Sequence, residues 1–230
     1  MVYVSRTALA AALVACVSFG TAQAAPVISA SIVVDPTASN LPFAVENLGS
    51  GGGPGLVSQT PLVLSTGASV SFSGLSGVYA GDVSGVTRSP FRDGGGAATD
   101  AHYLNARAGT AGGAVTIEYA LQQTAFTLLW GSVDPSPATY NTLTFTFSGG
   151  GGTEVVTGAD VIAGLSSVVS GVTNLAVAIS GLQAFDKITI TASNEAFEFV
   201  PGLPVPEPAS LMLFGAGLLG LGLVRRCRTN

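Results

Sequence analysis

The chain has 230 residues, of which 47% are hydrophobic and only 9% are charged, and it contains 31 glycines. This composition excludes a helical bundle, which needs Glu, Lys and Leu, and it excludes a charged disordered chain. Residues 25–203 hold four basic side chains against twelve carboxylates, a net charge of about −8, and so lack the basic surface that nucleic-acid binding requires.

The first 24 residues have the pattern of a signal peptide. Arg6 provides a short positive region, residues 7–20 are apolar, and Ala-Gln-Ala at residues 22–24 is a small-residue cleavage site. The segment LVAC, which ends at Cys16, also has the form of a bacterial lipoprotein site. Cleavage after Ala24 and lipidation at Cys16 are therefore alternative outcomes of export.

The pattern of the segment from residue 25 to about residue 203 predicts a succession of β-strands. In TLTFTF (residues 142–147), Leu143, Phe145 and Phe147 alternate with threonines, which is the period of a strand with one buried face. Ser-Gly-Gly-Gly-Gly follows and predicts a hairpin with TEVVTG, and GADVIAGL (residues 158–165) is the one segment expected to form a short helix. The same alternation occurs in SVSFSG, AVTIEYA, TAFTLLW, DKITIT and AFEFV. Turn-rich clusters separate these segments, so we expect a single all-β domain, an antiparallel β-sandwich or a jelly-roll-like fold.

Two glycine-rich stretches, residues 48–58 and 91–100, are predicted to be surface loops. Neither contains the Gly-Lys-Ser/Thr of a phosphate-binding loop, and neither has the glycine spacing of a dinucleotide site after a strand.

The sequence predicts no catalytic residue and no cofactor. Its single histidine, His102, lies in a predicted strand, and no G-x-S-x-G motif is present. Both cysteines, Cys16 and Cys227, lie outside residues 25–203, which excludes a thiolate nucleophile, a disulfide and a cysteine-bound metal in the domain. The twelve carboxylates could supply the acid pair of a glycan hydrolase, but the sequence singles out none of them.

Structural calcium is the one metal that the residues allow. Asp134 and Asn141 flank one loop, and Asp93 and Asp100 flank another, as in the oxygen-rich calcium clamps of extracellular proteins. The same residues are also explained as turn formers, because Asp and Asn bond to their own backbone. Both interpretations remain open at this level.

Two aromatic residues are candidates for stacking on a sugar ring. Trp130 continues the face of Phe126 and Leu128, which predicts packing in the core. Tyr140 lies in a proline-rich loop and is the freer candidate for a ligand contact.

The C-terminal segment has three unlike parts in series. Pro206, Glu207 and Pro208 precede an apolar run over residues 209–224, and Arg225, Arg226 and Arg228 follow it. As a helix, the run would be about 24 Å long against a hydrocarbon core of about 30 Å. The basic residues after it are typical of a cytoplasmic end that stops translocation.

These three parts resemble the PEP-CTERM sorting signal of Gram-negative bacteria. The resemblance implies that an exosortase, a multi-pass membrane protease-transpeptidase, recognises and cuts the tail. It also implies that the protein contacts the inner membrane transiently and then passes to the outer surface or the extracellular matrix.

A second segment is similar to one found in many PEP-CTERM surface proteins. It has the form Trp-Gly-Ser-x-Asp followed by Tyr-Asn-x-Leu at the start of a strand. The matching residues here are Trp130, Gly131, Ser132, Asp134, Tyr140, Asn141 and Leu143. AFEFV (residues 196–200) looks like the closing strand of those proteins. No activity follows from either likeness.

The sequence therefore predicts a signal peptide (residues 1–24), an extracytoplasmic β-sandwich (25–203) and a sorting signal (204–230) with a transmembrane helix over 209–224. We expect a non-enzymatic, exported component of an exopolysaccharide or biofilm matrix whose partners are the exosortase and exopolysaccharide. The alternatives are a carbohydrate-binding module at the cell surface and, less favoured, a glycan hydrolase.

Overall fold

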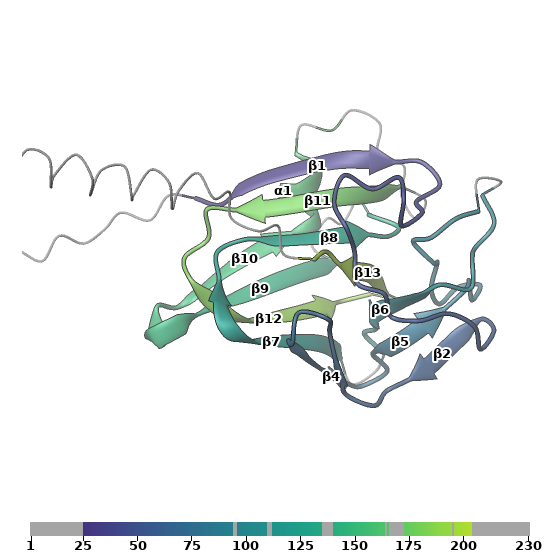
Figure 1. Ribbon diagram of the computed structural model, residues 1–230, viewed down its shortest axis with the longest axis horizontal. Coiled ribbons are helices and arrows are strands. Elements are labelled where there is room, and N and C mark those ends of the chain that lie inside the picture. The colour runs from purple at the N-terminus through teal and green to yellow at the C-terminus, as the bar shows by residue number, and fades with distance from the viewer. Residues whose placement is uncertain are drawn as a thin grey trace, which may run out of the picture.

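The computed structural model describes residues 25–93, 96–109, 112–134, 140–163, 165, 173–194 and 196–203 (Figure 1). The predicted signal peptide and the predicted C-terminal span lie outside these residues, as do the Pro-Glu-Pro motif and the basic cluster. In the described ranges, no helix has both the length and the apolar character needed to cross a membrane.

The described residues form two antiparallel sheets, one of seven strands and one of six, as the sequence predicts for an all-β domain. In spatial order, sheet 1 contains β1 (Val27–Val33), β11 (Asn174–Ser180), β8 (Phe126–Trp130), β13 (Phe197–Pro201), β6 (His102–Ala106), β5 (Gly77–Ala80) and β2 (Gly55–Ser58). Sheet 2 contains β10 (Thr153–Thr157), β9 (Asn141–Phe147), β12 (Phe185–Ala192), β7 (Gly113–Gln123), β4 (Ser69–Ser73) and β3 (Leu62–Val63).

The strands from β6 to β13 pair in a nested way. The first pairs with the last, β6 with β13, and the next pairs are β7 with β12, β8 with β11 and β9 with β10. A long hairpin folded over on itself gives this order, which is the pairing of a jelly roll. The remaining strands extend the sheets, with β1 beside β11, β5 and β2 beside β6, and β4 and β3 beside β7.

The core lies between the two sheets and is built by the alternation read from the sequence. Phe126, Leu128 and Trp130 of sheet 1 and Leu143 and Phe145 of sheet 2 are buried in one cluster. The rings of Phe126 and Phe145 meet edge to face with centroids 6.1 Å apart, which joins the two sheets directly. The predicted inward faces of these strands are therefore confirmed.

The predicted hairpin and the predicted helix are both present. The Gly-rich segment after Phe147 makes a short 3₁₀ turn, η1 (Ser148–Gly150), in which Gly149 has a φ of 70°, a conformation that favours glycine. The Phe147 N–H closes this turn by donating to the Gly152 carbonyl (2.9 Å). The helix α1 (Gly158–Ile162) begins with a capping box between Thr157 and Asp160.

Neighbouring residues of β9 provide a test of the alternation. Replacing the fully buried Phe145 with Ala should lower the free energy of unfolding by about 3–5 kcal/mol, because it leaves a cavity between the sheets. Replacing Thr144, one residue earlier and on the outer face, with Ala should lower the free energy of unfolding by about 1 kcal/mol or less. Urea unfolding of both variants measures the difference, and equal losses would contradict the assigned faces.

Candidate functional site

The most unusual side chain of the sandwich is a carboxylate in the middle of an aromatic strand. In β13, Phe197 and Phe199 point into the core, so Glu198 points to the outer face of sheet 1. This face is covered by other parts of the chain, and Glu198 is only 2% exposed. A buried carboxylate is tolerated only where hydrogen bonds replace its water.

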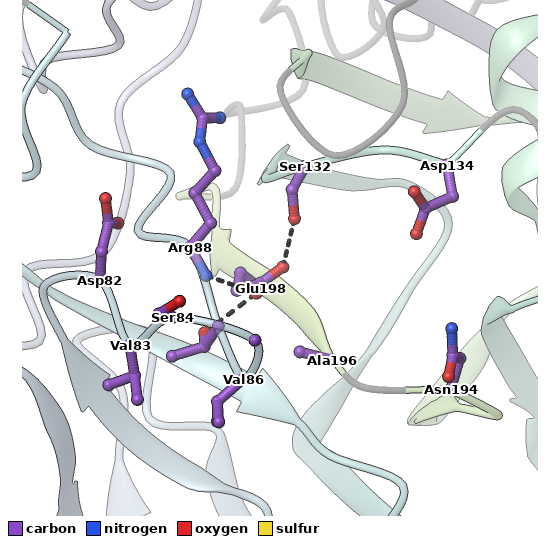
Figure 2. A pocket seen from close by; sticks show the side chains of 12 residues that line it. Asp82, Val83, Ser84, Val86, Arg88, Ser132, Asp134, Asn194, Ala196 and Glu198 are labelled. Carbon is purple, nitrogen blue, oxygen red and sulfur yellow. Dashed lines mark hydrogen bonds between the residues drawn. The ribbon is translucent and has the colours of Figure 1, made fainter.

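Three groups from two other segments supply those hydrogen bonds (Figure 2). Glu198 Oε1 accepts from the Thr87 hydroxyl (2.9 Å) and from the Arg88 backbone N–H (2.8 Å). Glu198 Oε2 accepts from the Ser132 hydroxyl at 2.6 Å. The carboxyl thus ties β13 to the loop after β5 and to the end of β8.

Burial raises the pKa of the Glu198 carboxyl above its ordinary value of 4.5. The hydrogen bonds from Ser132, Arg88 and Thr87 favour the charged form and oppose this rise only in part.

The hydrogen-bond network continues away from Glu198 into sheet 1. Thr87 Oγ1 accepts from Asn105 Nδ2 (3.0 Å) and lies 3.0 Å from the Tyr103 hydroxyl, which donates to the Gly81 carbonyl (2.8 Å). Burial raises the pKa of Tyr103, so this hydroxyl keeps its proton. The network is polar, buried and connected to the backbone of the covering loop.

An ion pair holds that loop in place over sheet 1. The Arg92 guanidinium contacts both Asp82 oxygens, with Nη1–Oδ2 at 2.8 Å and Nη2–Oδ1 at 3.1 Å. Asp82 also accepts from the Ser89 N–H (2.8 Å). Beneath the loop lies a second apolar cluster on the outer face of sheet 1, formed by Tyr79, Phe91, Tyr103, Leu129 and Val200.

A cavity of about 400 Å³ opens beside Glu198. Figure 2 shows Ser84 and Val86 of the loop on one side of Glu198, and Asp134 and Asn194 on the other. Both Glu198 oxygens already accept from the chain's own groups, so this carboxyl acts first as a structural link. The mouth still offers hydroxyl, amide and carboxylate groups that can hydrogen-bond to a small hydroxylated ligand.

The Trp-Gly-Ser segment brings Ser132 to the wall of this cavity. The Gly131 N–H donates to the Glu198 carbonyl (2.8 Å), and a Cβ at Gly131 would lie 3.0 Å from Pro90 Cβ and 3.2 Å from Glu198 Cβ. Ser132 has a φ of 43°, in the left-handed region, and its N–H donates to Asn174 Oδ1 (3.2 Å). The close approach and the strained turn aim the Ser132 hydroxyl at the carboxyl.

The predicted calcium ligands lie in different surroundings. Asp134 lines the cavity, but Asn141 is buried at the start of β9 and its Oδ1 has no hydrogen-bond partner. Asp93 accepts from the Ala97 N–H (3.0 Å) in its own loop, and the Asp100 carbonyl accepts from the Gly51 N–H (3.0 Å). No group of three His, Cys, Asp or Glu side chains able to hold a metal ion occurs among the described residues. Calcium stays a prediction.

The predicted aromatic residues also have different positions. Trp130 is fully buried and stacks on Phe197 with ring centroids 4.2 Å apart, in the core as its pattern indicates. Tyr140 is half-buried next to β9, its carbonyl accepts from the Ser193 N–H (2.7 Å), and it does not line the cavity.

His102 links the first glycine-rich loop, residues 48–58, to sheet 1. Its ring nitrogens lie 3.0 Å from the Leu48 carbonyl and 2.8 Å from the Gly51 carbonyl, and Ser50 bridges to Ala101. The histidine therefore fastens loop backbone, as expected of a strand residue without catalytic partners.

A second cavity of about 370 Å³ lies beside Leu203, just after the end of β13. Its walls include Val45, Leu62 and Val63. Glu46 also lines it and is 5% exposed. Its Oε2 accepts from the Ser65 N–H (3.0 Å), whereas its Oε1 has no hydrogen-bond partner.

Sequence reasoning missed Glu198 and Glu46 as site residues. For Glu198 a signal existed, because a lone acidic residue stands inside the aromatic strand AFEFV. Its partners Thr87 and Ser132 lie 111 and 66 residues away in the chain, and no local pattern connects them.

Comparison with known proteins gives one finding, at the C-terminus. The family model of the PEP-CTERM protein-sorting motif matches residues 204–226, which include the Pro-Glu-Pro segment, the apolar run and the first two arginines of the basic cluster. The match begins at the residue after Leu203, the last one described. Neither the curated proteins nor the solved structures gave a match to the chain.

Replacing Glu198 with Gln tests the buried carboxyl. The folded state favours its protonated form, so wild-type stability should fall as the pH rises from about 4.5 through the raised pKa and stay level above it. Gln cannot ionise, and it can still accept from Thr87 and Arg88 and donate to Ser132. Urea unfolding between pH 4 and pH 8 should therefore show the stability difference shifting in favour of the variant as the pH rises. If the difference in unfolding free energy between the wild type and the Gln variant does not change with pH, the raised pKa of a buried Glu198 is contradicted.

Proposed function

We propose that this protein is a non-enzymatic component of the cell surface or the extracellular matrix, delivered there after an exosortase removes its C-terminal tail. The observation that carries the proposal is the PEP-CTERM motif at residues 204–226. This motif implies export and membrane-associated sorting in a Gram-negative bacterium, with processing by an exosortase. A role in an exopolysaccharide or biofilm matrix is the finer part of the proposal.

The position of the motif supports a division of the chain at residue 203. The Leu203 N–H donates to the Ala44 carbonyl (2.8 Å), and residue 204 already belongs to the motif. We propose residues 1–24 as the signal peptide, 25–203 as the extracytoplasmic sandwich and 204–230 as the sorting segment with its membrane span.

The surface of the sandwich supports a structural role over glycan binding by aromatic stacking. Among the described residues, every Phe, Tyr and Trp side chain is buried or partly buried, and the largest ones lie in the core. A stacking platform for sugar rings needs an aromatic face open to solvent. The acid pair of a glycan hydrolase is also weakly supported, because the carboxyl of Glu198 is already bonded on both oxygens.

A carbohydrate-binding module remains the second candidate, and the cavity beside Glu198 favours it. Asp134 and Asn194 at its mouth offer the polar groups that hydroxylated ligands require. A glycan array probed with the exported protein and with an Asp134→Ala, Asn194→Ala double variant tests this. Binding that the double variant loses would replace the structural proposal with this one.

Replacing Pro206-Glu207-Pro208 with Ala-Gln-Ala tests the sorting function. In the native host, the wild-type protein should lose its C-terminal tail and leave the inner membrane, while the variant should keep its full mass and stay there. Intact-mass spectrometry of the membrane and surface fractions measures both.

A matched control alters another Pro-x-Pro segment, Pro135-Ser136-Pro137, to Ala-Ser-Ala and should be processed normally. If both the wild type and the variant keep the tail, the protein is a membrane-anchored sandwich and the sorting proposal is wrong.

A further inference from the structure

The two ends of the described chain leave the sandwich on the same side. The Gly202 N–H donates to the Thr127 carbonyl (2.7 Å), so β13 ends where β8 begins. β1 begins at Val27, opposite Ser180 at the end of β11, which is this same side of sheet 1. Figure 1 shows the start of β1 and the turn of the β9–β10 hairpin on one side of the molecule.

We call this side the tail end and define it by five segments. Strand direction and register place these connections and strand ends beyond the level of Leu203, on the side where the sorting motif leaves the sandwich. They are residues 25–27, 64–68, 119–125, 148–152 and 181–184.

Charged residues border the five segments of the tail end: Asp186 accepts from the Ser148 hydroxyl (3.0 Å), Glu46 accepts from the Ser65 N–H (3.0 Å), and Glu118 pairs with Lys187 (3.5 Å). None of the five segments itself contains Asp, Glu, Lys or Arg, although the domain as a whole has a net charge of about −8. Connections at the opposite end, after β1, β6, β8 and β10, carry Asp35, Arg107, Asp134 and Asp160. The five segments are thus uncharged themselves, whereas the connections at the opposite end are not.

Three aliphatic side chains protrude at or beside the tail end. Leu121 is 78% exposed, Val63 is 71% exposed and Val27 is 63% exposed. Val63 also lines the cavity that contains Leu203, so it lies close to the start of the sorting motif. Protruding aliphatic groups are favoured at a lipid interface, where their apolar surface leaves water.

The chain leaves little length between the sandwich and a membrane. Leu203 is held by its hydrogen bond to Ala44, and the apolar run begins at Ala209, six residues later. Six residues span at most about 20 Å when fully extended. The β9–β10 turn already reaches beyond Leu203, because Phe126, level with Leu203, packs on Phe145, five residues before Gly150. Phe147, the end of β9, lies two strand residues or about 7 Å beyond Phe145, and the turn after it adds to this projection, which uses part of the available length.

We propose that the tail end of the sandwich lies against the lipid headgroups of the inner membrane while the sorting tail is uncut. The inference rests on the proposed function, in which residues 209–224 span that membrane. Contact would hold Pro206, three residues from Leu203, at the membrane surface where a membrane-embedded protease acts. The cavity beside Glu198, at the other end of β13, would face away from the lipid.

A fluorescence experiment on residues 25–230, with the sorting tail uncut, tests this contact. A Cys227→Ser background without the leader receives a single Cys at Leu121 or, as the matched control, at Val34, which is 76% exposed beyond the far end of β1. Each chain is labelled with an environment-sensitive dye and reconstituted in vesicles of phosphatidylethanolamine and phosphatidylglycerol that carry nitroxide lipids.

We expect several-fold stronger quenching at position 121 than at position 34. Equal quenching of two chains that float with the vesicles would overturn the contact and leave the sorting proposal intact. Chains that do not float with the vesicles would overturn the membrane span, and this inference with it. Matching thermal unfolding of the two labelled chains shows that neither replacement disturbs the fold.

Discussion

The rest of the structure depends on β13, which contacts the core on one face and a covering loop on the other and leads into the sorting motif at its end. β13 lies inside sheet 1 between β8 and β6, and it sends Phe197 and Phe199 into the core. Its one charged residue, Glu198, faces the covering loop, and its end leads directly into the sorting motif. Because β13 pairs with β6, whose Ala106 lies 91 residues before its partner Phe197, the placement of β13 closes the nested set of strand pairs.

The buried carboxylate makes that placement specific. A slip of β13 by one residue would turn every side chain to the other face, which would put Glu198 among aromatic rings and Phe197 and Phe199 beneath a polar loop. The carboxylate would then lose the donors from Thr87, Arg88 and Ser132, at the cost of an unpaired buried charge. The same three bonds fix the loop and the strained turn at Ser132, so register, loop position and cavity wall are set by one side chain.

The alternation of residues allowed the sequence to predict the sheets, the inward faces, the β9–β10 hairpin and the burial of Trp130. These features depend on neighbours two residues apart, which the sequence shows directly. Asn141 was interpreted as a loop ligand because of its neighbours, yet the period of β9 turns it inward. The partners of Glu198 and the set of segments at the tail end could not be predicted, because each depends on which distant segments the topology brings together. A loop that covers the outer face of sheet 1 likewise leaves no periodic signal.

The end of the sandwich and the start of the sorting motif meet within one residue, and this has a physical consequence. The core side chains end at Val200, and the last backbone bond of the domain is the one from Leu203 to Ala44. The core side chains and the β13 hydrogen bonds found among the described residues all lie before the Pro-Glu-Pro region. A cut in that region would therefore leave in place the contacts that the described residues of the jelly roll make with one another. In the proposed function, processing changes where the sandwich is held, while Glu198 keeps its partners at the end of β8 and in the covering loop.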